Sequence, residues 1–168
     1  YEIMPSLVGS EMCIRYSDHT HQLVIKKNGK LIKTIPISMG TDLHPTPNGI
    51  YYIGDKHESM VMDSSTYGVP INSPEGYKTQ VSWATRMSYS GIFIHAAPWS
   101  VWAQGSSNTS HGCLNVSVSN GEWVYRNLKA GDPVTVKNSK GPTLQGNEGL
   151  GDWNIPWSEW KAGNAKTD

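Results

Sequence analysis

Two short segments joined by Asn28-Gly29 are the feature that most constrains the fold of this chain. Residues 22–27 and 30–37 each have the length and composition of a β-strand. An Asn-Gly pair between two such segments is the strongest short signal for a β-hairpin. Residues 11–16 show a further strand pattern just before this hairpin. The sequence therefore predicts that the chain begins with a β-meander.

Strand patterns continue through most of the remaining sequence. They cover residues 50–54, 59–63, 79–89, 92–95 and 133–138. Residues 64–78 are turn-formers and aromatics without a period of 2 or 3.6, which predicts a long ordered loop of the kind that is often functional. The fold class predicted from these segments is mostly β.

One stretch, residues 117–132, has a helical pattern. Its apolar residues Val118, Trp123, Val124 and Leu128 recur at helical spacing. Two starts are possible: Ser117 caps the helix, or Ser119 and Glu122 form a capping box. Gly131 is the predicted C-terminal stop. With either start, we expect the helix N-terminus to lie near Cys113.

Composition and charge narrow the classes of partner. The chain has 168 residues, enough for one main domain, and its 14 basic residues balance its 14 acidic ones. We therefore expect no nucleic acid and no anionic membrane surface as a partner. No apolar run approaches the roughly 20 residues of a membrane-spanning helix. Because the sequence opens on Tyr1, we expect a processed piece that has lost an export signal and upstream domains.

The stretch 92–115, IFIHAAPWSVWAQGSSNTSHGCLN, holds the reactive side chains. His95 ends an apolar run, and Cys113 follows a loop of small polar residues. A cysteine attacks as the thiolate, which a nearby imidazolium and a helix N-terminus favour. His95 is the better partner, because His111 is too close in sequence to meet the thiol in line. The pattern indicates a Cys113/His95 pair for acyl transfer.

The residues just before Cys113 suggest how the reaction would be stabilised. Gly112 permits an unusual backbone turn. The amides of His111, Gly112 and Cys113 would then converge on an oxygen that gains negative charge, as in an oxyanion hole.

Structural roles and metal binding are the alternatives for these residues. Single cysteines and histidines are more often structural than catalytic. A four-ligand zinc site is a weaker possibility, built from His111 and Cys113 with His95 and either His44 or His57. No Cys-x-x-Cys or His-Glu-x-x-His spacing supports it, so we expect neither metal nor cofactor. A disulfide between Cys113 and Cys13 has only the even cysteine count in its favour.

The spacing of these residues resembles a known signature. His95, fourteen intervening residues and then SHGCLN at 110–115 are similar to the motif of the L,D-transpeptidases, the YkuD-type catalytic domain. Segments 62–65 (MDSS), 98–100 (PWS) and 151–157 (GDWNIPW) extend the similarity to the mycobacterial members. The resemblance implies a YkuD-type β-sandwich or barrel-like domain with one or two short helices and a Trp-rich C-terminal extension.

The resemblance also implies an activity. The family forms 3→3 cross-links in peptidoglycan: a cysteine attacks the third residue of a donor tetrapeptide stem, D-alanine leaves, and the side-chain amine of an acceptor stem takes the acyl group. Carbapenem β-lactams inactivate its members. The implied location is extracytoplasmic, in the periplasm or cell wall, with a membrane anchor in the full-length protein. A peptidoglycan-binding module without turnover and an L,D-carboxypeptidase are the alternatives.

Site roles follow from the resemblance residue by residue. Cys113 is similar to the nucleophile and His95 to the general base and acid, oriented by the backbone carbonyl of Ala96. His111, Gly112 and Asn115 complete the motif. Residues 59–81 resemble a flap over the donor site, with Tyr77 helping to hold the oxyanion. The implied lining of the donor pocket is Met62, Trp99 and Ser110.

Two positions depart from close relatives, and the tail raises a separate question. Relatives often carry serine where this chain has Ala96 and glycine where it has Trp102. The added bulk of Trp102 would reshape the acceptor side of the site or the access of β-lactams. We expect residues 1–138 to form the catalytic domain and residues 139–168 an extension packed on it. In this interpretation Trp153, Trp157 and Trp160 dock the extension; a ligand platform is the alternative.

Overall fold

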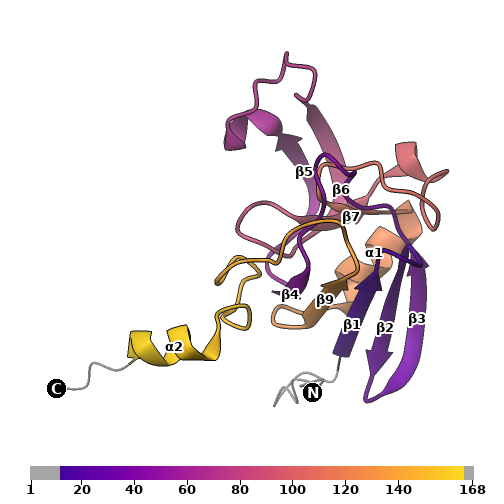
Figure 1. The fold of residues 1–168 in the computed structure, drawn as a ribbon. Coiled ribbons are helices and arrows are strands. Elements are labelled where there is room, and N and C mark those ends of the chain that lie inside the picture. Colours follow the sequence, from indigo (N-terminus) through magenta and orange to yellow (C-terminus); the bar gives the residue numbers. More distant parts are fainter. Residues whose placement is uncertain (1–11, 165–168) are drawn as a thin grey trace.

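Two β-sheets dominate the computed structural model, which describes residues 12–164 (Figure 1). The first sheet has the strand order β3-β2-β1-β9-β4 and the second β5-β6-β7-β8. The first comprises β1 (Met12–Ser17), β2 (Gln22–Lys27), β3 (Lys30–Pro36), β4 (Gly49–Tyr52) and β9 (Pro133–Lys137). The second comprises β5 (Lys56–Asp63), β6 (Lys78–Arg86), β7 (Phe93–Ala96) and β8 (Leu114–Val116). The mostly β fold predicted from the sequence is confirmed.

The predicted opening meander forms the edge of the first sheet. β1 and β2 are antiparallel, as are β2 and β3, and β1 also pairs in parallel with the late strand β9. Asn28 and Gly29 have φ angles of 49° and 77°, as a two-residue hairpin turn with left-handed backbone requires. Residue 11, the first of the predicted opening strand, lies outside the described residues.

One hydrophobic core joins both sheets and the helix α1 (Val118–Asn127). Its fully buried members include Ile14, Leu23 and Ile25 of the first sheet and Ile94 and Leu114 of the second. Full burial of each such aliphatic side chain contributes about 1.5–3 kcal/mol. The strands that carry the site are therefore held from behind by the main core of the domain.

The helix follows one of the two predicted starts. Ser117 is the N-cap and accepts a hydrogen bond from the Asn120 backbone N–H at 3.3 Å. The capping box does not form, because Ser119 lies inside the helix and Glu122 pairs with Arg126 instead. The predicted stop at Gly131 is wrong: the backbone is already extended at Leu128, which is the C-cap.

A protruding hairpin formed by β5 and β6 carries the predicted loop at its tip (Figure 1). β5 begins at Lys56, three residues before the predicted start, whereas β6 begins at Lys78 and ends at Arg86, three residues before the predicted end. The predicted loop 64–78 contains a short 3₁₀ helix, η1 (Ser64–Tyr67). Ser64 closes its neck: the Ser64 N–H donates to the Tyr77 carbonyl, and the Tyr77 N–H donates to the Ser64 hydroxyl, each at 2.9 Å. We call residues 64–77 the flap.

The C-terminal segment is joined to the domain by the buried Leu144, a member of the main core, and by polar contacts. The Asn154 amide group pairs with the backbone of Ile50 on the edge strand β4, at 3.0 and 2.7 Å. Trp153, Trp157 and Trp160 all keep a substantial exposed fraction. Trp153 nevertheless lies beside Tyr52 of β4 and lines a cavity with it, as expected of a docking residue. Trp157 and Trp160 stack on each other in α2 (Trp157–Asn164), which projects away from both sheets (Figure 1). Among residues 12–164, no helix is long and apolar enough to cross a membrane.

Candidate active site

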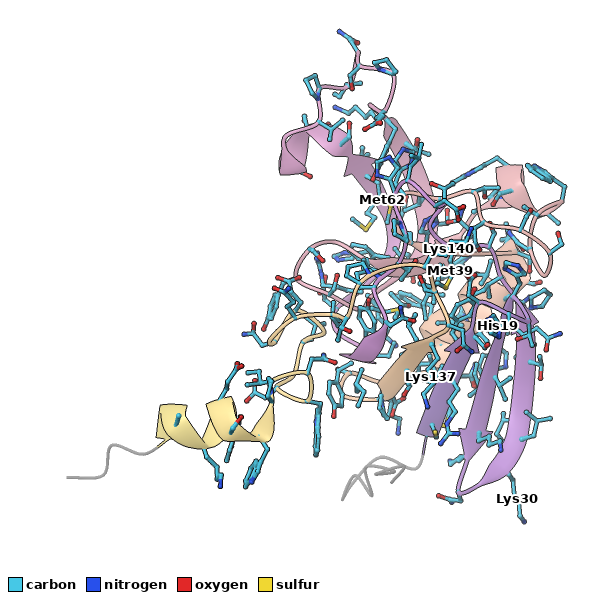
Figure 2. All side chains as sticks on the ribbon, viewed as in Figure 1. His19, Lys30, Met39, Met62, Lys137 and Lys140 are labelled. Atoms are coloured by element: carbon cyan, nitrogen blue, oxygen red, sulfur yellow. The ribbon has the colours of Figure 1, made fainter. Side chains whose placement is uncertain are left out.

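A cavity beneath the flap brings together most of the site residues predicted from the sequence. Figure 2 labels Met62 on β5, one of the walls. The lining residues are Met62, Tyr77, Thr79, Val81, His95, Trp99, Thr109, Ser110, His111, Cys113 and Asn115. Ala96 lies outside this lining, as does Gly112, which faces a second cavity. Thr79, Val81 and Thr109 are lining residues that the motif did not identify.

Strand pairing explains why the histidine and the cysteine meet. β7 and β8 are parallel neighbours, with His95 opposite Asn115 and Ile94 opposite Leu114. Cys113 immediately precedes Leu114, so the chain places it next to Phe93, two residues before His95, and both His95 and Cys113 line the cavity. The connection between them, residues 97–113, contains η2 (Pro98–Ser100), which carries Trp99 to the cavity wall. Residues 18 positions apart are thus fixed by one sheet.

His95 is held as a neutral base. Its side chain is buried, and its Nδ1 lies 3.0 Å from the backbone carbonyl of Ala96. A carbonyl only accepts, so Nδ1 carries the proton and Nε2 keeps its lone pair. Burial lowers the pKa of His95, and the bond to Ala96 opposes this effect in part. The imidazole is therefore uncharged at neutral pH, with Nε2 as its proton-accepting atom.

Cys113 is a neutral thiol, which corrects the expectation of a lowered pKa. Burial raises the pKa of Cys113 to about 11, and the Phe93 backbone N–H offsets only part of this effect. The thiol donates to the Gly91 carbonyl at 3.7 Å. The helix N-terminus cannot supply the expected stabilisation, because β8 separates Cys113 from the N-cap Ser117 by a span of about 13 Å.

The backbone turn at 110–113 is fixed by one side chain. The Ser110 hydroxyl donates to the Cys113 carbonyl at 2.6 Å and accepts from the Gly112 N–H at 3.1 Å. Gly112 has a φ of 119°, a conformation that L side chains rarely adopt. The Gly112 amide is thus used inside the turn, which leaves the amides of His111 and Cys113 as the candidates for the predicted oxyanion hole.

A loop distant in sequence supports the same turn. The Thr46 hydroxyl is buried and donates to the Gly112 carbonyl at 2.8 Å, while the Gly40 N–H donates to Thr46 Oγ1 at 3.2 Å. The Thr41 N–H donates to the Ser110 carbonyl at 2.9 Å. No motif in the sequence singled out Thr46. Its position before Pro47 in a turn-rich segment was the only available signal.

Asn115, a lining residue of the cavity, holds a buried acceptor without a partner in the part of the chain that the structure describes. Its side chain is buried, and its Nδ2 donates to the Ser100 hydroxyl at 3.3 Å. Its Oδ1 is buried and has no hydrogen-bond partner among residues 12–164. A buried acceptor without a partner costs about 1–3 kcal/mol. Oδ1 of Asn115 is therefore an unsatisfied acceptor beside the cavity.

A second cavity reaches Cys113 from the other side of the flap. Its lining includes His44, Pro45 and Glu75 together with Gly112 and Cys113. Tyr77 and His111 line both cavities, and their ring centroids lie 5.2 Å apart. The two side chains therefore separate the two approaches to the thiol.

The residues of the zinc alternative are partly dispersed. His57 contacts Asp55 at 2.6 Å and lines neither of the two cavities that reach Cys113. Within residues 12–164, no group of three or more His, Cys, Asp or Glu side chains is arranged to hold a metal ion. Cys13 and Cys113 are both free thiols.

The chain is similar to proteins of one family. The YkuD family, the L,D-transpeptidase catalytic domain, matches residues 10–136. L,D-transpeptidase 2 of Mycobacterium tuberculosis (strain CDC 1551 / Oshkosh) is 58% identical over 159 residues, which cover 95% of this chain and 39% of that protein. The chain thus spans well under half of that relative's length.

Solved structures agree with the sequence comparison. The L,D-transpeptidase LdtMt1 in complex with imipenem is 39% identical, with a TM-score of 0.75 over 77% of this chain and 60% of that one. L,D-transpeptidase 3 of Mycobacterium tuberculosis with a faropenem-derived adduct is 33% identical, with a TM-score of 0.72 over 77% and 61%. On these similarities in sequence and fold, the chain belongs to the YkuD family of L,D-transpeptidase catalytic domains.

Proposed function

We propose that this chain is the catalytic domain of a cell-wall L,D-transpeptidase that forms 3→3 peptidoglycan cross-links through a Cys113 thioester. The observation that carries the proposal is the neutral His95. Its Nδ1 is hydrogen-bonded to the Ala96 carbonyl, and the pairing of β7 with β8 places His95 opposite Asn115, two residues after Cys113. A thiol and a neutral base sharing a cavity are suited to acyl transfer.

Acylation begins with a proton transfer that the substrate triggers. As Sγ of Cys113 attacks the carbonyl carbon of the third stem residue, Nε2 of His95 takes the thiol proton. The carbonyl oxygen gains negative charge and is held by the amides of His111 and Cys113, with Tyr77 assisting. The intermediate collapses as His95 returns the proton to the departing amine, and D-alanine leaves.

Deacylation repeats these steps with a new nucleophile. The side-chain amine of an acceptor stem attacks the thioester, and His95 removes a proton from that amine. The second tetrahedral intermediate expels the sulfur, which regains a proton from His95. Water is the competing acceptor, so the flap favours transfer by limiting the access of water to the thioester.

The remaining site residues bind the donor. Met62, Trp99 and the flap residue Tyr77 supply the apolar walls, Ser110 shapes the catalytic turn, and Asn115 offers Oδ1 to a stem N–H. A carbapenem would acylate the same thiol, which accords with the β-lactams named for two related structures. The proposed location is extracytoplasmic, where peptidoglycan stems are accessible.

One experiment separates this function from its alternatives. The protein is incubated with a disaccharide tetrapeptide, and the products are identified by mass. A cross-linked dimer with released D-alanine is the expected result. Tripeptide alone would indicate an L,D-carboxypeptidase, and unchanged substrate a peptidoglycan-binding module. Cys113→Ala serves as the control that must abolish both products.

A further inference from the structure

The flap meets the body of the domain at a histidine that the proposed mechanism does not use. His44 lies between two other side chains. Its Nε2 is 3.8 Å from Oε2 of Glu75 on the flap, and its ring centroid is 4.7 Å from that of His111 in the catalytic turn. His111 in turn contacts Tyr77 at the base of the flap. His44 therefore connects the flap to the motif from both sides.

The backbone beneath His44 is fixed to the catalytic turn. The His44 N–H donates to the Thr41 carbonyl at 3.1 Å, and the Thr41 N–H donates to the Ser110 carbonyl. Gly40 fits so closely against this segment that a Cβ at its position would lie 2.1 Å from the His44 carbonyl oxygen. His44 thus presents its ring from a rigid support rather than from a freely moving loop.

The flap lacks such a support near Glu75. Beyond the neck at Ser64 and Tyr77, its hydrogen bonds are local ones, such as Ser73 N–H to the Pro70 carbonyl and Gly76 N–H to the Ser73 carbonyl, both at 2.9 Å. Glu75 belongs to this outer part and lines the second cavity with His44. A contact at this point therefore controls how far the outer flap lies from the catalytic turn.

We propose that His44 is a positioning residue that clamps the flap over Cys113, through its contact with Glu75 on one side and with His111 on the other. The inference rests on the proposed function, since a closed flap favours an amine acceptor over water. The contact is weak because the side chains of His44 and Glu75 remain partly exposed, and solvent screens such pairs. A weak clamp allows the flap to open for each substrate.

The charges near His44 determine the conditions of the test. Glu75 on the flap is the facing acid, while His111 in the turn and Tyr77 on the flap are the facing aromatic groups that can titrate. Burial lowers the pKa of His111, the neighbouring His44 adds to this effect, and Glu75 opposes it in part. All variants are therefore compared at one fixed pH.

Three variants separate the two contacts of the clamp. His44→Phe keeps a ring against His111 and removes the attraction to Glu75. Glu75→Gln removes the same attraction by changing the flap residue instead. His44→Lys keeps a cation and loses the ring. Asp42→Asn is the matched control, because it removes a charge from the same loop whose partner is Lys140 rather than the flap.

Hydrogen exchange of residues 64–77 is the primary measurement, and it needs no turnover. We expect His44→Phe and Glu75→Gln each to raise the hydrogen-exchange rate of the flap about two- to fivefold. The double variant should exchange no faster than either single variant. His44→Lys should retain part of the protection, and Asp42→Asn should retain all of it. Unchanged exchange in both single variants, or effects that multiply in the double variant, would overturn the proposal.

The product distribution is the second measurement. In the same two single variants, the ratio of hydrolysed to cross-linked product should rise about two- to fivefold, while the rate of acylation by a carbapenem changes less. A ratio that stays constant while flap exchange increases would overturn the link to acceptor choice. The unaltered protein could make no product while the single and double variants still show the expected non-additive increase in flap hydrogen exchange. That result would refute the proposed function and support the contact between His44 and Glu75.

Discussion

Gly121 on α1 packs directly against Ala96 on β7, the residue whose carbonyl holds His95. A Cβ at position 121 would lie 3.1 Å from the Ala96 nitrogen and 3.2 Å from its Cβ, closer than most side-chain contacts. Gly121 therefore allows the helix to approach β7, and the position of the helix is coupled to the Ala96 carbonyl that accepts from His95.

The first prediction concerns this contact. Gly121→Ala should gain about 1 kcal/mol of helix propensity, and the crowding at Ala96 should cancel most of that gain. We expect the free energy of unfolding to change by less than about 1 kcal/mol, while kcat/KM falls about tenfold because the Ala96 carbonyl shifts relative to His95. Urea denaturation and steady-state kinetics measure the two effects. Ser119→Ala, on an exposed position of the same helix, should leave kcat/KM unchanged; equal losses in both variants would contradict the prediction.

The second prediction follows from the neutral resting state of the site. Because burial raises the pKa of Cys113 to about 11, the thiolate is absent at neutral pH and appears only as the pH rises toward that value. Thiolate absorbance, with Cys113→Ala subtracted, should therefore increase with a midpoint near pH 11. A midpoint near pH 6 would indicate a preformed thiolate–imidazolium pair instead.

His95 sets the opposite side of the pH dependence. Its pKa is lowered by burial, so the neutral base persists to more acidic pH than a free imidazole would. The acidic limb of kcat/KM should accordingly lie below pH 6.5. His95→Gln should reduce kcat about 10²- to 10⁴-fold and remove that limb. An acidic limb above pH 7 would show that a different group controls the reaction.

The contrast between motif and environment explains what could be predicted from the sequence. The Asn28-Gly29 pair is a local pattern and predicted the opening meander. The spacing of His95 and Cys113 is also a pattern of the sequence itself and identified the candidate reactive pair. The pKa of Cys113 depends on burial by residues far away in the chain, so no motif could give its direction. The strand β8, only three residues long, displaced the helix N-terminus from the thiol, and so short a strand leaves little trace in a sequence pattern.

Side-chain contacts over long sequence separations were equally out of reach. The Thr46 hydroxyl bonds to Gly112 across 66 positions, and His44 meets Glu75 only because two separate loops converge beside the catalytic turn. The Ser110 hydroxyl is close in sequence to Gly112, but its bond to that amide depends on the turn conformation, which the motif alone does not define.

The third prediction tests Thr46. Thr46→Val keeps the shape of the side chain and removes the hydroxyl that joins Gly40 to Gly112, leaving buried backbone groups without a partner. The free energy of unfolding should fall by about 1–3 kcal/mol, and kcat should fall as the oxyanion-binding turn loosens. Thr34→Val, at an exposed position of β3, is the matched control and should stay within about 0.5 kcal/mol. Stability unchanged in both variants would contradict the role of the buried hydroxyl.

The fourth prediction separates stability from binding at Asn115. Asn115→Leu removes an acceptor that is buried without a partner and sacrifices only the 3.3 Å bond to Ser100. Since replacing an unsatisfied polar group by an apolar one of similar volume relieves its desolvation cost, the variant should be as stable as the unaltered protein or more so. KM for the donor tetrapeptide should nevertheless rise about tenfold, because the stem N–H loses its acceptor. Ser100→Ala breaks the same bond but keeps Oδ1, so it should leave KM nearly unchanged. A loss of stability with unaltered KM would mean that Asn115 supports the fold rather than the substrate.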